Sequence, residues 1–154
     1  ALLGSEEKFA KITVFVQDVG GGRQATIWEV AHAAITGKSK YSFGKVSAVD
    51  DLLTAGPDKS SQALGRLQGT FAYTGLNETS LTANINFHLT SGPYSGSTLC
   101  VAGRNPVQES NRELPLVGGT GVFRAARGYA IVNTISFDKA TNYAVLQYTF
   151  YVSY

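Results

Sequence analysis

The carboxyl groups of this 154-residue chain are its best candidates for chemistry. Asp18 is in phase with three apolar residues of an alternating run, Ile12, Val14 and Val16, so its side chain points inward if that face is buried. Desolvation raises the pKa of such a carboxyl group, which can then donate a proton to a substrate oxygen. The alternative is structural: Asp18 begins the Gly20–Gly22 turn, a position that aspartate favours.

A second acidic pair and one arginine are further candidates. Asp50 and Asp51 are adjacent, so strand alternation sends one inward and the other outward, and an ion pair or turn cap is the structural alternative. Arg112 precedes Glu113 and the apolar segment 114–117. Its guanidinium could anchor a phenolate or lie beside Asp18, whereas a salt bridge on the outer surface is the simpler role.

Metal and redox chemistry find little support among the other residue types. His32 and His88 lie far apart, with no Cys, Asp or Glu at ligand spacing, so no metal site is predicted. Cys100 is the only cysteine, which excludes an intramolecular disulfide. We interpret it as a small apolar strand residue rather than a reactive thiol.

Two common site motifs were also considered. No Gly-x-Ser-x-Gly motif is present, which argues against a hydrolase nucleophile. The glycine-rich stretch 117–123 lacks the third glycine and the βαβ context of a dinucleotide site, so it is interpreted as a connection between strands. The sequence therefore predicts no cofactor.

Charge and hydropathy limit the partners. The formal net charge is +2 and the basic residues are scattered, which argues against nucleic-acid binding. No run approaches the ~20 apolar residues that cross a bilayer. No leader pattern begins at Ala1, so we expect a cytosolic chain or a processed one. Asn77-Glu78-Thr79 is an N-glycosylation sequon in a predicted turn, as in secreted proteins.

The elements that must position these residues have a period of two. In 81–90 and again in 146–154, apolar and polar residues alternate without a break. Other predicted strands, each followed by turn residues, are 9–18, 24–31, 43–50, 64–74, 97–103, 111–117 and 128–135. Such a series predicts an antiparallel sandwich or a closed barrel, and the barrel is favoured because no strand carries the protection of an open edge. With no linker or repeat, residues 1–154 form one domain.

Several strands carry large apolar residues in both phases. Phe15 stands opposite the Ile12 face, and Tyr151 stands opposite Tyr148 and Phe150. One barrel interior cannot hold both faces, so the sequence predicts that a ring of identical subunits covers part of the outer surface.

Taken in order, these segments resemble the plant dirigent protein family over about 120 residues. The matching pieces are Phe15–Val19, Phe43–Lys45 with Val49–Asp51, Gly65–Gly69 with Phe71 and Tyr73, Tyr94–Leu99, Ala102–Pro106, Arg112-Glu113, Gly118–Phe123 and Ala126–Ala130. The resemblance implies an eight-stranded antiparallel β-barrel of the dirigent or allene-oxide-cyclase type, assembled as a homotrimer. It also implies a secreted, apoplastic protein, and the sequon makes Asn77 the predicted glycosylation site of a glycoprotein.

The resemblance carries a set of site residues with it. Asp18 and Arg112 match the family's catalytic acid and arginine. Phe71 or Tyr73 matches an aromatic cavity wall, Thr134 matches a cavity threonine, and Asp50 and Asp51 join the predicted substrate-binding set. Asn105 stands where lignan-forming members carry an aspartate, and the cysteines that those members use near both ends are missing. Both departures argue against pinoresinol formation.

Three functions are consistent with this resemblance. The first is stereocontrol of phenoxy-radical coupling or quinone-methide chemistry in phenylpropanoid biosynthesis, with no oxidative centre and with a laccase or peroxidase as the radical source. The second is a pterocarpan-synthase-like cyclase or dehydratase, in which Asp18 donates a proton and Arg112 stabilises phenolate charge. The third is a cell-wall scaffold in lignin deposition, whose lumen would be lined by Thr82, Asn84, Asn86 and His88.

Overall fold

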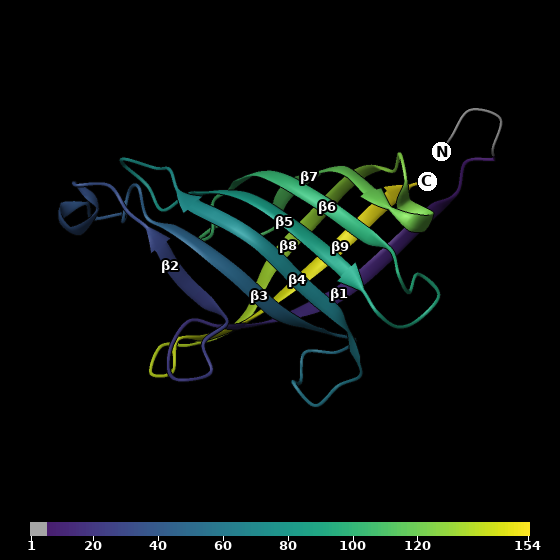
Figure 1. Ribbon diagram of the computed structural model, residues 1–154, viewed down its shortest axis with the longest axis horizontal. Helices are drawn as coiled ribbons and strands as arrows, with labels where there is room; N and C mark the ends of the chain where they lie inside the picture. Colours follow the sequence, from purple (N-terminus) through teal and green to yellow (C-terminus); the bar gives the residue numbers. More distant parts are fainter. Residues whose placement is uncertain (1–5) are drawn as a thin grey trace.

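The chain folds into nine antiparallel strands, described for residues 6–154 in a computed structural model (Figure 1). The strands are β1 (Phe9–Val19), β2 (Ile27–Ala31), β3 (Val46–Thr54), β4 (Ala63–Tyr73), β5 (Leu81–Leu89), β6 (Thr98–Asn105), β7 (Arg112–Thr120), β8 (Arg127–Asp138) and β9 (Tyr143–Ser153). Two short 3-10 turns, η1 (Thr36–Lys38) and η2 (Gly121–Phe123), are the only helical elements among the described residues. None of those residues belongs to a helix long and apolar enough to cross a membrane.

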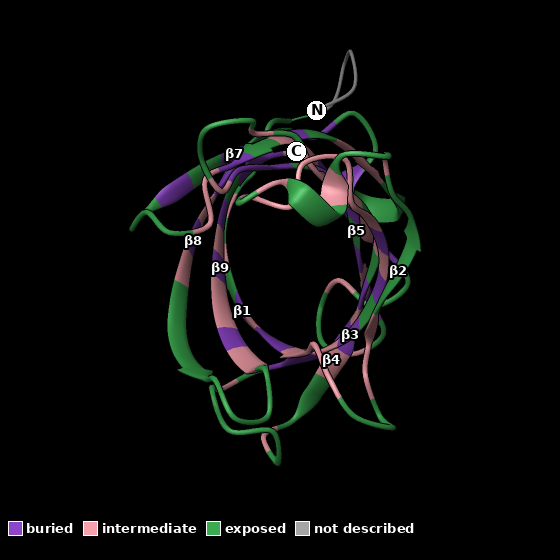
Figure 2. Cartoon of the chain, turned by 90° about the vertical axis from the view of Figure 1, so that its left-hand side faces the viewer, coloured by how far each residue is buried: buried purple, intermediate pink, exposed green. Residues whose placement is uncertain are grey.

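Eight of the strands close into a barrel, which confirms the predicted fold. The order is β1-β9-β8-β7-β6-β5-β4-β3, and β1 returns to pair with β3 through Phe15↔Thr54 and Gln17↔Leu52. β2 pairs with β3 beyond the end of β1. It therefore lengthens the barrel wall at one end and is not a ninth strand of the closed ring. Figure 2 looks along the barrel and shows this ring. Closure leaves little open sheet edge that could pair with another chain.

The alternation in β5 decides which residues face inward. Its apolar residues, Leu81, Ala83, Ile85, Phe87 and Leu89, are all buried. Thr82, Asn84 and Asn86 are exposed, and His88 is half-buried beside Thr98. The expectation that these four polar residues line the lumen, which belonged to the scaffold function, is therefore wrong. Burying the apolar phase is favoured because an unpaired polar side chain costs free energy in the interior.

Several strand boundaries differ from the predictions, among them those of β2, β3 and β7. β2 begins at Ile27 rather than residue 24, and β3 runs from Val46 to Thr54 rather than over 43–50. β7 continues to Thr120 through glycines that were interpreted as a connection. Gly119 pairs with Leu99, and a Cβ atom added there would lie 2.4 Å from the carbonyl oxygen of Thr98. Gly119 therefore permits close strand pairing, whereas Gly121 lies in η2, in the connection after β7, with a φ of 64°.

The two ends of the barrel differ. Where β9 ends, Tyr94, Phe123 and Tyr154 pack together with ring centroids 5.0 to 6.2 Å apart. Phe87 contacts Tyr148 and Phe150 further inside, with both centroid distances at 4.8 Å. These aromatic contacts fill the interior at this end of the barrel. Both chain termini lie at the same end (Figure 1). The opposite end, where β9 begins, contains a cavity.

Candidate functional site

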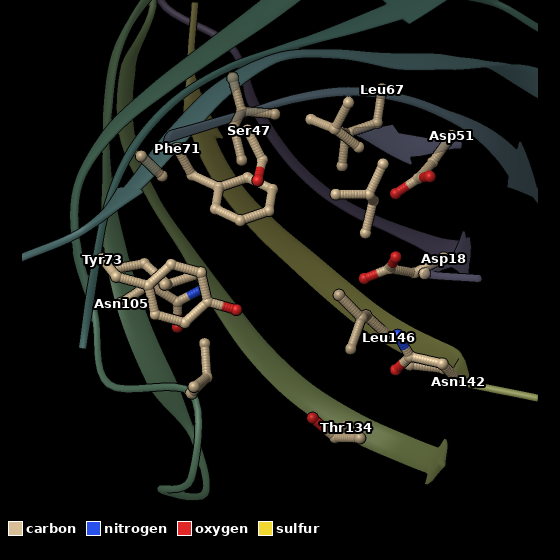
Figure 3. Close-up of a pocket in the computed structure, with 18 of the residues that line it drawn as sticks. Asp18, Ser47, Asp51, Leu67, Phe71, Tyr73, Asn105, Thr134, Asn142 and Leu146 are labelled. Carbon is tan, nitrogen blue, oxygen red and sulfur yellow. The ribbon is translucent and has the colours of Figure 1, made fainter. Parts of the chain in front are cut away.

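A cavity of about 840 Å³ opens at this second end of the barrel. Residues of β1, β3, β4, β5, β8 and β9 line it, together with residues of β2 and the loops 20–26 and 106–111. Its volume suits one drug-sized organic molecule. Most of its wall is apolar, and a few polar side chains project into it (Figure 3).

Asp18 and Asp51 form an acidic pair on one wall of the cavity. The β1–β3 register ends at Gln17↔Leu52, so the next residues in line are Asp18 and Asp51, both on the inner face. Residues at facing positions have Cβ atoms roughly 5 Å apart. Figure 3 shows both carboxyl groups on the same side of the cavity. The Thr26 hydroxyl donates a hydrogen bond of 2.5 Å to Oδ1 of Asp51.

The environment of this pair favours neutral carboxyl groups. Burial raises the pKa of Asp18 to about 6. Burial also raises the pKa of Asp51, to about 8, and the neighbouring charge of Asp18 adds to the effect. The hydrogen bond from Thr26 acts in the opposite direction but is the smaller influence. At neutral pH at least one of the two acids therefore retains a proton that it can donate.

Arg112 lies on another wall, within a polar cluster. It is 4% exposed, and its Nε donates to Oδ1 of Asn105 at 2.8 Å. Its Nη1 donates to the carbonyl oxygen of Glu109 at 3.1 Å and to the hydroxyl of Thr134 at 3.2 Å. No carboxylate of residues 6–154 forms a salt bridge with it, and burial lowers its pKa. This guanidinium can stabilise negative charge that develops on a bound ligand.

Aromatic side chains form the remaining part of the site. Phe71 and Tyr73 follow one another on the inner face of β4, with ring centroids 6.2 Å apart. The ammonium group of Lys45 lies 5.5 Å from the centroid of the Tyr73 ring. Burial raises the pKa of Tyr73, and the Asp18 charge raises it further. These rings offer a flat apolar surface to an aromatic ligand.

The structure brings seven of the eight predicted site residues to this cavity: Asp18, Asp51, Phe71, Tyr73, Asn105, Arg112 and Thr134. Asp50 is the exception and does not line the cavity, because strand alternation turns it to the outer face. There its Oδ1 accepts a hydrogen bond of 2.7 Å from Nε of Arg66, and the two side chains form an exposed ion pair. Its assignment as a substrate-binding residue is therefore corrected.

The remaining candidates lie outside the cavity. His32 is exposed and lies 3.3 Å from Glu29, and no group of three or more potential metal ligands occurs within residues 6–154. Cys100 is half-buried, and burial raises the pKa of its thiol, which disfavours the reactive thiolate. Asn77 is exposed in the turn between β4 and β5.

Sequence reasoning missed four residues that line or support the site. Ser47 on β3 and Lys45, which directly precedes β3, are in phase with Asp51, so extending the alternation back from Asp51 would have found them. Tyr148 is fully buried at the cavity wall, in phase with Leu146, and burial raises its pKa. Thr26 carries no sequence signal, because it reaches Asp51 only through the fold of the β1–β2 loop.

Comparisons with known proteins agree with this geometry. A family model described as Dirigent-like protein matches residues 9–153. Dirigent protein 1 of Arabidopsis thaliana is 41% identical, over 90% of this chain and 78% of that protein. Pterocarpan synthase 1 of Glycine max is 37% identical, over 99% of this chain and 83% of that protein. The solved structure of the pterocarpan synthase dirigent protein GePTS1 superposes with a TM-score of 0.88 at 35% identity, covering 99% of this chain and 88% of the other.

Proposed function

This chain belongs to the dirigent-like protein family, and from that premise we propose that it holds a phenolic substrate in its barrel and directs the stereochemistry of a quinone-methide ring closure. The observation that carries the proposal is the Asp18–Asp51 pair, which keeps a proton at neutral pH beside an aromatic-walled cavity. The similarity to pterocarpan synthases in sequence and in structure supports it.

The proposed chemistry needs no oxidant. A neutral carboxyl of the acidic pair donates its proton to a benzylic hydroxyl, the C–O bond breaks, and water leaves. The phenol conjugated to that carbon loses its proton to solvent as the quinone methide forms, and the carboxylate regains a proton from solvent. A second phenol oxygen of the same substrate then adds to the benzylic carbon, and its proton passes to the quinone oxygen as the ring becomes aromatic again. The net change is the loss of one water molecule.

Arg112 has a separate role in this scheme. As the quinone oxygen regains negative charge during ring closure, a guanidinium at the opposite wall stabilises it. The aromatic wall of Phe71 and Tyr73 presents one face of the planar intermediate to the nucleophile. A difference of only ~1.4 kcal/mol between the two closures gives a tenfold preference for one enantiomer.

The test is turnover without any oxidase. The purified chain is incubated with an isoflavanol that carries a free phenol on its pendant ring, and the products are separated by chiral chromatography. We expect one enantiomer of the dehydrated, ring-closed product to accumulate faster than without protein. Product formation at the uncatalysed rate and in racemic form would exclude this function.

The cavity favours one further function, stereocontrol of phenoxy-radical coupling. Its volume of about 840 Å³ has room for two phenylpropanoid units, and polar groups stand on separate walls to orient each. A laccase or peroxidase would supply the radicals. Adding the chain to a laccase that oxidises coniferyl alcohol would yield an enantiomeric excess, whereas racemic products across a panel of phenols would exclude this role.

The proposal also covers the location and the oligomeric state of the protein. We propose a secreted, apoplastic glycoprotein, and the exposed position of the Asn77 sequon supports this because a glycan needs an acceptor side chain at the surface. We also propose a homotrimer. Large apolar side chains that remain exposed on the barrel, among them Val117, Tyr129 and Tyr151, support a covered outer face.

A further inference from the structure

Ser47 is a buried hydroxyl that has no hydrogen-bond partner. The residue is 1% exposed, and among residues 6–154 its Oγ is the only fully buried side-chain nitrogen or oxygen that lacks a partner. Ser97 shows how such a group is usually satisfied: it is also buried, and its Oγ accepts the backbone N–H of Val122 at 3.1 Å. An unpartnered hydroxyl costs free energy in the folded protein, so Ser47 requires an explanation.

The unpartnered hydroxyl belongs to the cavity wall. Ser47 is in phase with Val49 and Asp51 along β3, and all three residues line the cavity. Figure 3 shows the Ser47 oxygen beside the ring of Phe71, the residue that faces Ser47 across the β3–β4 pairing. The Ser47 oxygen has almost no accessible surface in the ligand-free protein, so a ligand oxygen reaches it only when a neighbouring side chain such as the Phe71 ring turns aside. The aromatic ring of that ligand can then pack against Phe71.

The position of Ser47 along β3 also sets the length of a ligand that could contact both Ser47 and Asp51. It lies four residues from Asp51, which corresponds to roughly 13 Å along an extended strand. A single phenol ring cannot span that distance. A molecule with two aromatic rings and an oxygen at each end, such as an isoflavonoid, can contact Ser47 and the acidic pair together.

We propose that Ser47 is a substrate-binding residue that donates a hydrogen bond to a phenol or ether oxygen on the ring remote from Asp18 and Asp51. This inference rests on the proposed function, because it assumes a phenolic substrate in the same cavity. It adds to that function a residue that selects for an oxygen on the ring remote from the acidic pair.

The first arm of the test measures the ligand-free protein. Ser47→Ala removes the hydroxyl at nearly constant volume and leaves no partner behind, so we expect its Tm to equal or exceed that of the wild type. Ser97→Ala is the matched control, because it removes the acceptor of the Val122 N–H and should lower the Tm. Its side chain does not line the cavity, so ligand binding should not change.

The second arm measures ligand affinity by isothermal titration calorimetry. The probes are the isoflavone daidzein, which has a phenol on each terminal ring, and two analogues that each lack one of these phenols. We expect Ser47→Ala to weaken daidzein binding about five-fold, a typical loss for one hydrogen bond, while binding of one analogue is unchanged. The variant would then bind daidzein and that analogue with similar affinity.

The possible outcomes separate this inference from the proposed function. If the wild type binds daidzein and Ser47→Ala leaves every affinity unchanged, the role of Ser47 is refuted while the phenolic site stands. A lower Tm together with equal losses for all three ligands would show that the hydroxyl is structural and would also refute the inference. If the wild type binds none of the three isoflavones, the role of Ser47 is refuted, whereas the proposed function is decided separately by turnover of the isoflavanol.

Discussion

Asp18 and Asp51 occupy facing positions at the point where β1 closes the barrel against β3. They are separated by β2 and two loops in the sequence, yet closure places both carboxyl groups on one wall of the cavity. Burial raises the pKa of each, and the charge of Asp18 raises that of Asp51 further. A pair of this kind can keep one proton available at neutral pH.

The first prediction concerns proton donation by this pair. Asp18→Asn and Asp51→Asn each keep the size and the hydrogen-bond acceptor of the side chain but remove the acidic proton. We expect each variant to slow oxidant-free ring closure about 100-fold, a typical contribution of general acid catalysis. Asp50→Asn is the control and should keep the full rate, because its side chain faces outward. An unchanged rate in Asp18→Asn would contradict the acid role.

The second prediction concerns the pH dependence of stability. The pKa of Asp51 is raised from its ordinary value near 4 to about 8, so between these values the unfolded chain releases a proton that the folded chain retains. Stability therefore falls as pH rises through this window. Asp51→Asn removes the effect, and we expect it to be more stable than the wild type at pH 8 by ~1–3 kcal/mol.

Thermal unfolding at several pH values checks this prediction. The advantage of Asp51→Asn over the wild type should shrink as the pH is lowered and should disappear below about pH 3, where Asp51 is protonated in both the folded and the unfolded wild type. Asp50→Asn should show no such pH-dependent gain. An equal difference at pH 4 and pH 8 would mean that Asp51 is not held neutral by the fold.

The third prediction concerns the buried guanidinium of Arg112. Asn105→Asp replaces the amide oxygen that accepts the 2.8 Å hydrogen bond from Nε of Arg112 with a carboxylate oxygen. The positive charge lowers the pKa of the new acid, so its added stability is present above pH 4 and is lost as the pH falls. We expect the Tm difference from the wild type to shift in favour of the variant between pH 3 and pH 6.

The corresponding change in the free energy of unfolding should be about 1–3 kcal/mol, because desolvation offsets part of the charge attraction in a buried pair. Asn84→Asp introduces the same acid on the outer face of β5 and serves as the control. A pH profile that is the same for both variants would contradict the proximity of residue 105 to the guanidinium.

The fourth prediction concerns the hydrogen bonds of Gln17, which precedes Asp18 in β1. Gln17 is buried, donates to Oγ1 of Thr54 at 3.0 Å and to the carbonyl oxygen of Pro57 at 3.1 Å, and accepts a hydrogen bond from the Tyr143 hydroxyl. Tyr143→Phe leaves the Gln17 carbonyl oxygen without its donor. We expect a loss of about 1–2 kcal/mol in the free energy of unfolding, measured by urea denaturation.

Tyr129→Phe is the control for this variant, because the Tyr129 ring is partly exposed and stacks on Tyr151 through its face. Removing its hydroxyl should change stability by less than ~0.5 kcal/mol. Equal effects of the two substitutions would indicate that the Gln17 network contributes little.

The fifth prediction concerns assembly. Tyr129 and Tyr151 stack on the outer face with ring centroids 5.1 Å apart, and other large apolar side chains are exposed around the barrel. A homotrimer would cover part of this surface. Light scattering at micromolar concentration should give about three times the chain mass of 16.4 kDa. A stable species at the mass of one chain would refute the trimer.

Much of the fold follows from alternation that can be recognised in the sequence. The run 81–90 alternates without a break, and the structure turns its apolar phase inward because burial of those side chains stabilises the fold. The same periodicity placed Asp18 on the inner face of β1 and showed that Asp50 and Asp51 must point to opposite sides. Periodicity alone could not show which of those two acids points inward.

The candidate site depended on contacts between residues far apart in the sequence. The facing positions of Asp18 and Asp51 depend on the register of β1 against β3, and the support of Asp51 by Thr26 depends on the path of a loop. The missing partner of Ser47 is a property of its whole surroundings. The sequence by itself determined the strands, the alternation of side chains between their two faces, and the family, because a period of two is a local property. Only tertiary structure decided which polar groups meet, because barrel closure sets register and desolvation through long-range pairing.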